Sequence, residues 1–423
     1  MIQEGLLSFL QTHPATKYYL AYSGGLDSHV LLHASAALQA QYPKTFQFYA
    51  IHIHHGLQAN ADAWVVHAEQ TCAALNLPLK VIHLNLKPAV GESIEAFARQ
   101  ARYQALSECL AANEMLLTAH HQDDQAETFL LNALRGSGSA GLAAMPELRV
   151  LGAGQVGRPL LAFSRAQLEA YAQQHQLQYV DDPSNAELKF DRNYLRHEIL
   201  PRLQERWPAV SQTLTRAASW QAEQQQVLER LLAAQLAQFV GSQAHTLSAT
   251  ALNNQDELMQ KALVRYWLQS QGFTMPSAKK LQHILSDVFG SEADATPCLA
   301  WGTCEVRRYR DDVYALKPLS QHDAKQIIVW TDVEQDLYLP SLERSLAKTL
   351  LSNELKQEAL NLKSVITVRF RQGGERVQRA HGHSLELKTL FQTAGVPPWE
   401  RERVPLIYLG EQLRLVVGIY PKS

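Results

Sequence analysis

The chain has 423 residues, of which 46% are hydrophobic and 19% charged, a composition that excludes a disordered protein and suggests two to four domains. No apolar run reaches membrane-spanning length and the N-terminus lacks the basic start of a signal peptide, so we expect a cytoplasmic protein without a membrane partner. The four cysteines form no C-x-x-C pair, which indicates neither a zinc site nor a disulfide framework. The net charge of -2 alone neither favours nor excludes a nucleic-acid partner.

The first distinctive stretch is a glycine turn between an apolar strand and a helix. Ser23-Gly24-Gly25-Leu26-Asp27-Ser28 follows the apolar run 18–21 and precedes the apolar run 29–33. Two glycines let the backbone approach an anion, and the first amides of the following helix point at that anion. The serines add hydroxyl donors, whereas Asp27 would repel phosphate unless Mg²⁺ lies between them. The pattern predicts a phosphate cradle with a Mg²⁺ ligand beside it, and an ordinary turn is the alternative.

Two better-known phosphate loops do not fit this stretch. A Walker loop needs a Lys after its second Gly, and a dinucleotide-binding loop needs a third Gly and an acid at the end of the next strand. Here no such Lys is present, and the next strand ends in histidines. The remaining pattern, Ser-Gly-Gly-x-Asp-Ser, resembles the pyrophosphate loop (PP-loop) of adenylating ATP pyrophosphatases. That resemblance implies ATP, split between its α and β phosphates.

Up to about residue 180 the sequence alternates between short runs typical of strands and longer runs typical of helices. The expected strands are 18–22, 46–53, 79–84, 115–119 and 179–180. The expected helices are 27–39, 60–75, 93–112, 124–134 and 164–175. This alternation predicts an α/β fold with a doubly wound parallel sheet and right-handed crossovers. Ligands bind at the carboxyl ends of the strands in such sheets, where the motifs below lie.

Histidines and carboxylates cluster at two of these strand ends. The second strand ends in His52-Ile53-His54-His55, which we interpret as pocket lining for adenine or phosphate rather than as a metal site, because no carboxylate or cysteine completes a ligand set nearby. The fourth strand runs into His120-His121-Gln122-Asp123-Asp124-Gln125-Ala126-Glu127-Thr128. Asp124 and Glu127 lie at i and i+3, on one helical face. They could hold Mg²⁺ or an ammonium group, although acids in a first helical turn also serve as caps.

Arginines follow at three places. Arg99 and Arg102 share a helical face with Glu95, where an ion-pair ladder and a phosphate contact are equally good interpretations. Arg135 begins a glycine-rich stretch that could move over the site or touch phosphate. The run 192–196 begins a later helix with two arginines at i, i+4 spacing.

The sequence changes character twice after the sheet domain, for which we expect residues 1–210. Residues 211–320 predict a mainly helical domain for substrate binding, and residues 321–363 a mixed connecting segment. Residues 364–423 predict a small α+β domain with nine Lys and Arg against five Asp and Glu. This basic end on an otherwise acidic chain favours a polyanionic partner, with a solvated basic face as an equally good interpretation.

Taken together, these features resemble the tRNA(Ile)-lysidine synthetase family. The motifs that carry the resemblance are 23–28, 52–57, 120–128, 135–138, 182–185, 192–193, 369–376 and 395–399. The PP-loop alone marks only a superfamily, whereas the block 120–128 and the C-terminal motifs are more specific. One departure is Gln58, where the family usually has Arg, which leaves a phosphate or tRNA contact at this position open.

The resemblance implies ligation of L-lysine to C2 of the wobble cytidine of tRNA(Ile) with a CAU anticodon. ATP would first adenylate the cytidine with release of pyrophosphate, and lysine would then displace AMP to form lysidine. The residues implied for ATP are Ser23, Gly24, Gly25, Leu26, Asp27, Ser28 and His52. Those implied for lysine are Asp124, Glu127 and Arg192. Catalytic roles are implied for Asp27, His120, Asp124, Glu127 and Arg135, with Mg²⁺ at Asp27.

Two rival interpretations stay open. A PP-loop tRNA 2-thiolation enzyme would need a persulfide or cluster thiol, and Cys72 and Cys109 have no partner spacing. A tRNA-binding protein with an inactive nucleotide site would not need the intact set of Ser23, Asp27 and Asp124. The sequence leaves the oligomeric state open, and a homodimer is compatible with it.

Overall fold

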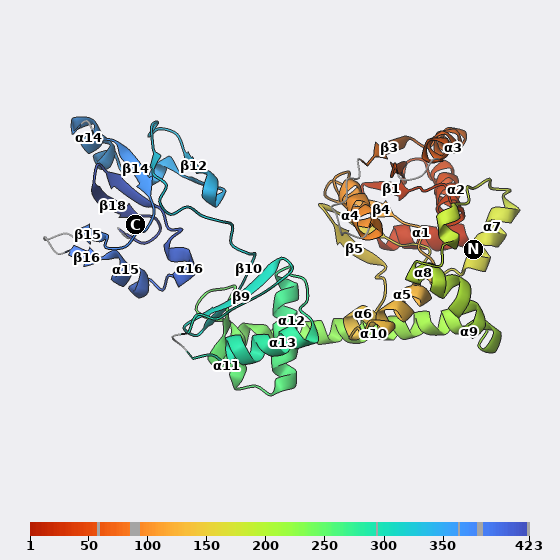
Figure 1. Ribbon diagram of the computed structural model, residues 1–423. Coiled ribbons are helices and arrows are strands. Elements are labelled where there is room, and N and C mark those ends of the chain that lie inside the picture. The colour runs from red at the N-terminus through yellow and green to blue at the C-terminus, as the bar shows by residue number, and fades with distance from the viewer. Residues whose placement is uncertain (57–59, 85–93, 293–294, 363, 379–383, 421–423) are drawn as a thin grey trace. The chain divides into compact units, whose positions relative to one another are not determined.

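The computed structural model describes residues 1–56, 60–84, 94–292, 295–362, 364–378 and 384–420 (Figure 1). Gln58, the position that departs from the family pattern, lies outside these ranges. The chain divides into two compact units, Met1–Leu228 and Glu229–Ser423. Within the described residues, no helix combines the length and the apolar character that a bilayer crossing requires.

A six-stranded sheet forms the centre of the first unit, with the strand order β3-β2-β1-β4-β6-β5. Its strands are β1 (Lys17–Ala21), β2 (Phe48–His54), β3 (Leu79–His83), β4 (Glu114–Leu117), β5 (Leu148–Leu151) and β6 (Gly154–Gly157). All neighbouring pairs are parallel except β5, which runs antiparallel to β6 at one edge. The predicted parallel α/β sheet is therefore confirmed.

The strand expected at 179–180 is wrong. The backbone N–H of Val180 donates to the carbonyl oxygen of Gly24 over 3.0 Å, so this segment packs against the glycine turn and not into the sheet. Its place in the sheet is taken by β6, whose short Gly-flanked sequence gives no strand pattern.

Helices follow most strands of the first unit. They are α1 (Ile2–Thr12), α2 (Leu26–Gln41), α3 (Ala61–Ala74), α4 (Ile94–Ser107), α5 (Gln122–Leu134), α6 (Ser139–Leu142), α7 (Arg165–Gln174), η1 (Pro183–Ala186), α8 (Asp191–Tyr194), η2 (Leu195–Ile199), α9 (Leu200–Arg206) and α10 (Val210–Leu236). Both faces of the sheet are covered, because alternate residues of β1 join different cores. Tyr18 and Leu20 pack with residues of α1, α2 and α7, whereas Tyr19 and Ala21 pack with Leu106 of α4.

The second unit begins with a helical region and a four-stranded antiparallel sheet of order β7-β10-β9-β8. Its elements are η3 (Ala237–Phe239), β7 (Leu247–Ser248), α11 (Ala249–Asn253), α12 (Glu257–Ser270), α13 (Ala278–His283), η4 (Ile284–Phe289), β8 (Cys298–Trp301), β9 (Cys304–Tyr309) and β10 (Asp312–Leu316). Trp267 and Phe289 are buried in its core. The helices expected for this region are present, together with the four strands of this sheet.

The rest of the second unit is built on another antiparallel sheet, of order β11-β14-β17-β18, with two hairpins. Its elements are β11 (Ile328–Val329), β12 (Leu337–Leu339), η5 (Pro340–Leu342), β13 (Arg344–Leu346), η6 (Lys348–Leu350), α14 (Asn353–Asn361), β14 (Ile366–Arg369), β15 (Arg376–Gln378), β16 (Ser384–Glu386), α15 (Leu387–Thr393), α16 (Pro398–Arg401), β17 (Leu406–Leu409) and β18 (Gln412–Val416). The segment 321–363 is more than a connection, because β11 pairs with β14 and Trp330 joins the core that holds Phe370.

Candidate active site

The turn between β1 and α2 has the backbone of an anion cradle. Gly24 has a φ of +89°, which residues with a side chain rarely adopt. No side chain caps α2, and its first internal hydrogen bond runs from His29 to Gly25. Within the part of the chain that the structure describes, the N–H groups of Leu26, Asp27 and Ser28 have no hydrogen-bond partner. A helix start with three free amides and a favourable dipole suits a phosphate group.

The two serines of the loop have different surroundings. Buried Ser28 donates its hydroxyl to the Gly25 carbonyl over 2.9 Å and accepts from the Ser23 N–H over 3.2 Å, which fixes the turn. Ser23 is exposed, and its Oγ lies 3.0 Å from that of Ser28. The Leu26 side chain is buried in the core, so only its amide can meet a ligand. We therefore expect Ser23 and the free amides to make the direct contacts.

His52, at the end of β2, is tied to the residue that precedes the loop. Its Nδ1 lies 3.0 Å from the carbonyl oxygen of Tyr22, so Nδ1 carries the proton and donates it. Burial lowers the pKa of His52 below its ordinary value, which keeps the ring neutral. This places His52 beside the loop, as an adenine or phosphate contact requires.

Asp27 is held by an arginine that the sequence analysis missed. Arg165, the first residue of α7, places Nη1 2.7 Å from Oδ1 and 2.8 Å from Oδ2 of Asp27. Its backbone N–H also donates to Oδ2 of Asp123 over 2.9 Å. Among the described residues, no group of three or more His, Cys, Asp or Glu side chains could hold a metal. Magnesium that arrives on nucleotide phosphates needs only one or two protein carboxylates, and Asp27 fits that role if Arg165 releases it.

His121 joins the two halves of the site. It caps α5: its Nδ1 accepts the Asp123 N–H over 3.3 Å, and its own N–H donates to Oδ2 of Asp124 over 2.9 Å. Its Nε2 lies 3.6 Å from Asp27 and 3.4 Å from Asp124. Burial alone would lower the pKa of His121, but the hydrogen bond of Asp27 and the charges of Asp124, Asp27 and Asp123 raise it.

The second half of the site is a compact cluster of two carboxylates and two arginines. Asp124 accepts Nη2 of Arg192 over 2.9 Å and Nη2 of Arg196 over 3.0 Å. Glu127 is fully buried and accepts Nε of Arg192 and Nε of Arg196, each over 2.6 Å. Burial opposes ionisation of Asp124, but the charges of His121, Arg192, His120 and Arg196 lower its pKa to about 2. Asp124 is therefore ionised, and the two guanidinium groups contact both carboxylates.

This geometry brings together the three residues that we expect to bind lysine. The carboxylates and Arg192 form one unit, as the expectation requires, but the arginines fill the positions that an ammonium group would take. Arg196 of η2 was not assigned a role from the sequence. Its spacing four residues after Arg192 is the signal that could have found it, because residues at i and i+4 share a helical face.

His120 is close to this cluster and to further arginines. Its Nδ1 is 2.8 Å from Oγ1 of Thr118. Burial lowers the pKa of His120 to about 3, with the charges of Arg158, Arg192 and Arg99 acting in the same direction and Asp124 opposing them. In the free protein His120 is a neutral ring, able to accept a proton but weakly basic.

Arg135 is the predicted catalytic residue that the structure does not place among these groups. It lies at the exposed end of α5, with Nη2 3.5 Å from Oδ2 of Asp191. Asp191 begins α8, the helix that carries Arg192. The described contact of Arg135 links the start of the glycine-rich stretch to α8. It does not reach the PP-loop.

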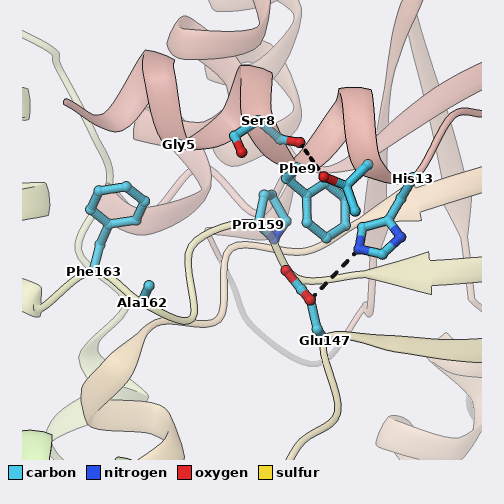
Figure 2. Close-up of a pocket in the computed structure, with 9 residues that line it drawn as sticks. Gly5, Ser8, Phe9, His13, Glu147, Pro159, Ala162 and Phe163 are labelled. Carbon is cyan, nitrogen blue, oxygen red and sulfur yellow. Dashed lines mark hydrogen bonds and ion pairs between the residues drawn. The ribbon is translucent and has the colours of Figure 1, made fainter.

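A pocket of about 350 Å³ lies elsewhere in the first unit, beside α1 (Figure 2). Its lining residues are Gly5, Ser8, Phe9, Thr12, His13, Glu147, Pro159, Ala162 and Phe163. The ionisable groups in it are His13 and Glu147, whose Nε2 and Oε2 lie 3.6 Å apart. None of the loop or cluster residues lines it, so we do not assign the chemistry to this pocket.

Comparison with known proteins agrees with the geometry over the whole chain. The family model for a PP-loop domain matches residues 1–203. The models for a TilS substrate binding domain and a TilS substrate C-terminal domain match residues 247–314 and 366–421.

Relatives of known activity match at nearly full length. The chain is 42% identical over 420 residues to the tRNA(Ile)-lysidine synthase of Coxiella burnetii, covering 98% of this chain and 92% of the relative. It is 43% identical over 401 residues to the enzyme of that name from Serratia proteamaculans, covering 95% and 90%. The solved U34-tRNA thiolase NcsA from Methanococcus maripaludis is 18% identical, covers 52% of this chain and 80% of its own, and has a TM-score of 0.43, a likeness too loose to argue from. By its identity to these synthases along almost its entire length, the chain belongs to the tRNA(Ile)-lysidine synthase family.

Proposed function

We propose that the protein ligates L-lysine to C2 of the wobble cytidine of tRNA(Ile) carrying a CAU anticodon, with ATP converted to AMP and pyrophosphate. The observation that supports this most is the full-length identity to lysidine synthases, combined with a free-amide PP-loop beside an acid–arginine cluster. We propose that residues 1–210 catalyse the reaction and that residues 211–320 and 364–423 bind the tRNA. Residues 321–363 connect these two tRNA-binding parts in the sequence.

In the first half-reaction the cytosine O2 attacks the α-phosphate of ATP, and pyrophosphate leaves. The amides of Leu26, Asp27 and Ser28 and the hydroxyl of Ser23 would hold the departing phosphates, because they are donors without partners at a helix start. His52 would contact the nucleotide from the neighbouring strand. Asp27 would hold Mg²⁺, which neutralises phosphate charge when bound. We also propose that Arg135 approaches a phosphate in the working complex.

In the second half-reaction the ε-amine of lysine attacks C2, and the C2–O2 bond breaks with O2 leaving on AMP. Asp124 and Glu127 would bind ammonium groups of lysine, and Arg192 would bind its carboxylate. For this to occur, Arg192 must exchange Asp124 for the lysine carboxylate, which preserves the charge balance of the cluster. The amine loses a proton in the attack, and neutral His120 or Asp124 would accept it.

A thiolation activity has weaker support. Burial raises the pKa of the Cys72 thiol and of the Cys304 thiol to about 11, which disfavours the thiolate in both. No described cysteine contacts the loop or the acid–arginine cluster in any recorded hydrogen bond or ion pair. We therefore retain the ligase as the function and propose that it acts in the cytoplasm, where a homodimer is one assembly to test.

The activity is tested with the full-length protein, a tRNA(Ile) transcript with a CAU anticodon, ATP and radiolabelled L-lysine. We expect lysine in the tRNA, equimolar AMP release, and pyrophosphate exchange that depends on tRNA. A transcript with U in place of the wobble cytidine is the control and should accept no lysine. AMP release that depends on tRNA, without lysine incorporation, would contradict the ligase.

The lysine site is tested separately with Asp124→Asn, which keeps the shape of the side chain but removes its charge. We expect the KM for lysine to rise at least about tenfold, the scale of one charge-assisted contact, while the KM for ATP changes little. Unchanged lysine affinity and turnover would exclude Asp124 from this site.

A further inference from the structure

Three arginines surround the phenol ring of Tyr103. The guanidinium carbons of Arg99, Arg102 and Arg149 lie 5.4, 5.6 and 5.5 Å from the ring centroid of Tyr103. Arg99, Arg102 and Tyr103 belong to α4, and Arg149 lies on the edge strand β5. Arg99, Arg102 and Tyr103 are close because they are neighbours in one helix, whereas Arg149 comes close to them only through the tertiary fold.

A fourth arginine, Arg158, also interacts with Tyr103 and has an unused donor. It is only 4% exposed, and its Nη1 donates to the Pro146 carbonyl over 2.5 Å. Its Nε is buried and has no hydrogen-bond partner in the described structure. Burial lowers the pKa of Arg158, the charges of Arg149 and Arg99 lower it further, and Tyr103 partly offsets them. We call Arg99, Arg102, Arg149 and Arg158 the Tyr103 arginine group.

The charge of this group has no carboxylate partner among the described side chains. Among the ion pairs of the described residues, none joins a carboxylate to any of its four members. Like charges this close repel one another, and a single aromatic ring offsets only a small part of that repulsion. Groups of unpaired arginines that share one small space are suited to a bound anion, above all to phosphate.

The position of the group indicates which anion it binds. The Thr118 N–H donates over 3.0 Å to the carbonyl oxygen of Gly157, the residue before Arg158, and Oγ1 of Thr118 lies 2.8 Å from Nδ1 of His120. The group therefore lies close to His120 and to the cluster where cytidine and lysine would react. The phosphates of ATP already have the free amides of α2. We therefore assign a second phosphate site near His120 to the other phosphate-bearing substrate, which is RNA.

We propose that the Tyr103 arginine group binds a backbone phosphodiester of the tRNA next to the reacting cytidine, with Arg149 as its outermost contact. This inference rests on the proposed function for the identity of the RNA. Arg149 is exposed, and its backbone pairs with Val156 of β6, so its side chain can meet a phosphate without rearrangement of the sheet. The buried Arg158 would position the other arginines. Its unused Nε–H would donate a hydrogen bond to the bound phosphate.

The test measures binding of a tRNA(Ile) transcript and, separately, of its isolated anticodon stem-loop at several salt concentrations, without ATP or lysine. For Arg149→Ala we expect both RNAs to bind about tenfold more weakly, because one charge-assisted contact is lost. The slope of log affinity against log salt should become shallower by about 0.7–0.9, the value for one phosphate contact. Arg149→Lys should restore most of the slope but less of the affinity.

The matched control is Arg202→Ala, which also removes one arginine of the first unit. Arg202 is exposed and already paired with Glu198, Nη2 to Oε2 over 3.3 Å, so its loss should leave the RNA affinity within about twofold. An unchanged salt slope in Arg149→Ala would overturn the proposal, as would weakening of the full tRNA but not of the stem-loop. A loss of ATP affinity equal to the loss of RNA affinity would assign the group to the nucleotide instead. Because these are binding measurements, they hold even if the protein fails to ligate lysine.

Discussion

Arg165 and Asp27 form an ion pair in which one guanidinium nitrogen serves both carboxylate oxygens, at 2.7 and 2.8 Å. The two residues are 138 positions apart in the sequence. The pair neutralises the carboxylate that the PP-loop presents, so Asp27 does not repel a phosphate in the free protein. It also means that Mg²⁺ and Arg165 compete for the same oxygens.

We predict that Arg165→Ala lowers the Mg²⁺ concentration needed for half-maximal activity several-fold, because Mg²⁺ no longer has to displace a guanidinium from Asp27. ATP binding in the presence of EDTA should weaken in the same variant, since Asp27 then faces the phosphates unpaired. Magnesium titration of the ligation rate and ATP binding by calorimetry measure the two effects. Glu169→Gln is the control, because it removes the other partner of Arg165, 2.8 Å from Nε, and leaves Asp27 paired. Equal Mg²⁺ dependence in Arg165→Ala and the parent protein would exclude the competition.

The two glycines of the loop should differ in what their replacement costs. Gly24→Ala places a side chain at a φ of +89° with no atom closer than 3.8 Å, so the cost is conformational and we expect about 1–2 kcal/mol of lost stability. Gly25→Ala keeps an ordinary φ of -73° and makes ordinary contacts with Ser23 Oγ at 3.6 Å and the Val180 carbonyl oxygen at 3.9 Å, so stability should change little. Its methyl group would nevertheless stand where a phosphate approaches. We therefore expect Gly25→Ala to raise the KM for ATP at least as much as Gly24→Ala does, while thermal unfolding separates the two variants. Full ATP affinity in Gly25→Ala would argue against close phosphate approach at this residue.

Much of the fold and the loop could be predicted because their signals are local. The alternation of apolar runs predicts the parallel sheet, and the PP-loop and the block 120–128 each lie within a few consecutive residues. Residues 148–157 gave no strand signal, because β5 and β6 are short and acquire their partners only through the fold. The unpredicted strands matter for function, since β5 carries Arg149.

The unpredicted part of the site consists of partners that are distant in the sequence. Arg165 meets Asp27 across 138 residues, and Arg196 meets Glu127 across 69. An arginine in an amphipathic helix has the same sequence signature whether it faces water or a buried carboxylate. Asp124 and Glu127 could therefore be recognised as a pair, but not the guanidinium groups that neutralise them.

The acid–arginine cluster should be a source of stability as well as of specificity. Arg196→Leu removes one of the two guanidinium groups that pair with fully buried Glu127. Breaking a buried pair typically costs about 3–5 kcal/mol. We expect about 2 kcal/mol here, because Arg192 still pairs with Glu127 and the Arg196 side chain is 36% exposed. Urea unfolding measures the loss, and the double variant Arg196→Leu with Glu127→Gln should recover part of it. If the double variant loses the sum of the two single losses, the residues are not coupled.

Buried histidines should make the protein less stable in mild acid. Burial lowers the pKa of His29 and of His55 to about 4 and that of His120 to about 3. Between pH 6.5 and 4 the unfolded chain therefore binds protons that the folded chain does not. The stability that the neutral histidines contribute is fully present above pH 6.5 and is lost as the pH decreases. The raised pKa of His121 acts in the opposite direction but is a single group against these three and His52. We expect the free energy of unfolding to decrease steadily from pH 7 to pH 5.

One of these contributions can be isolated at His29, which is 5% exposed and whose Nδ1 has no hydrogen-bond partner in the described structure. Each unit of pKa depression corresponds to about 1.4 kcal/mol once the pH is below both values. His29→Gln removes the titrating group but keeps a polar side chain, so its unfolding free energy should depend less steeply on pH than that of the parent. Parallel pH profiles for His29→Gln and the parent would show that His29 takes up its proton in the folded state as readily as in the unfolded chain.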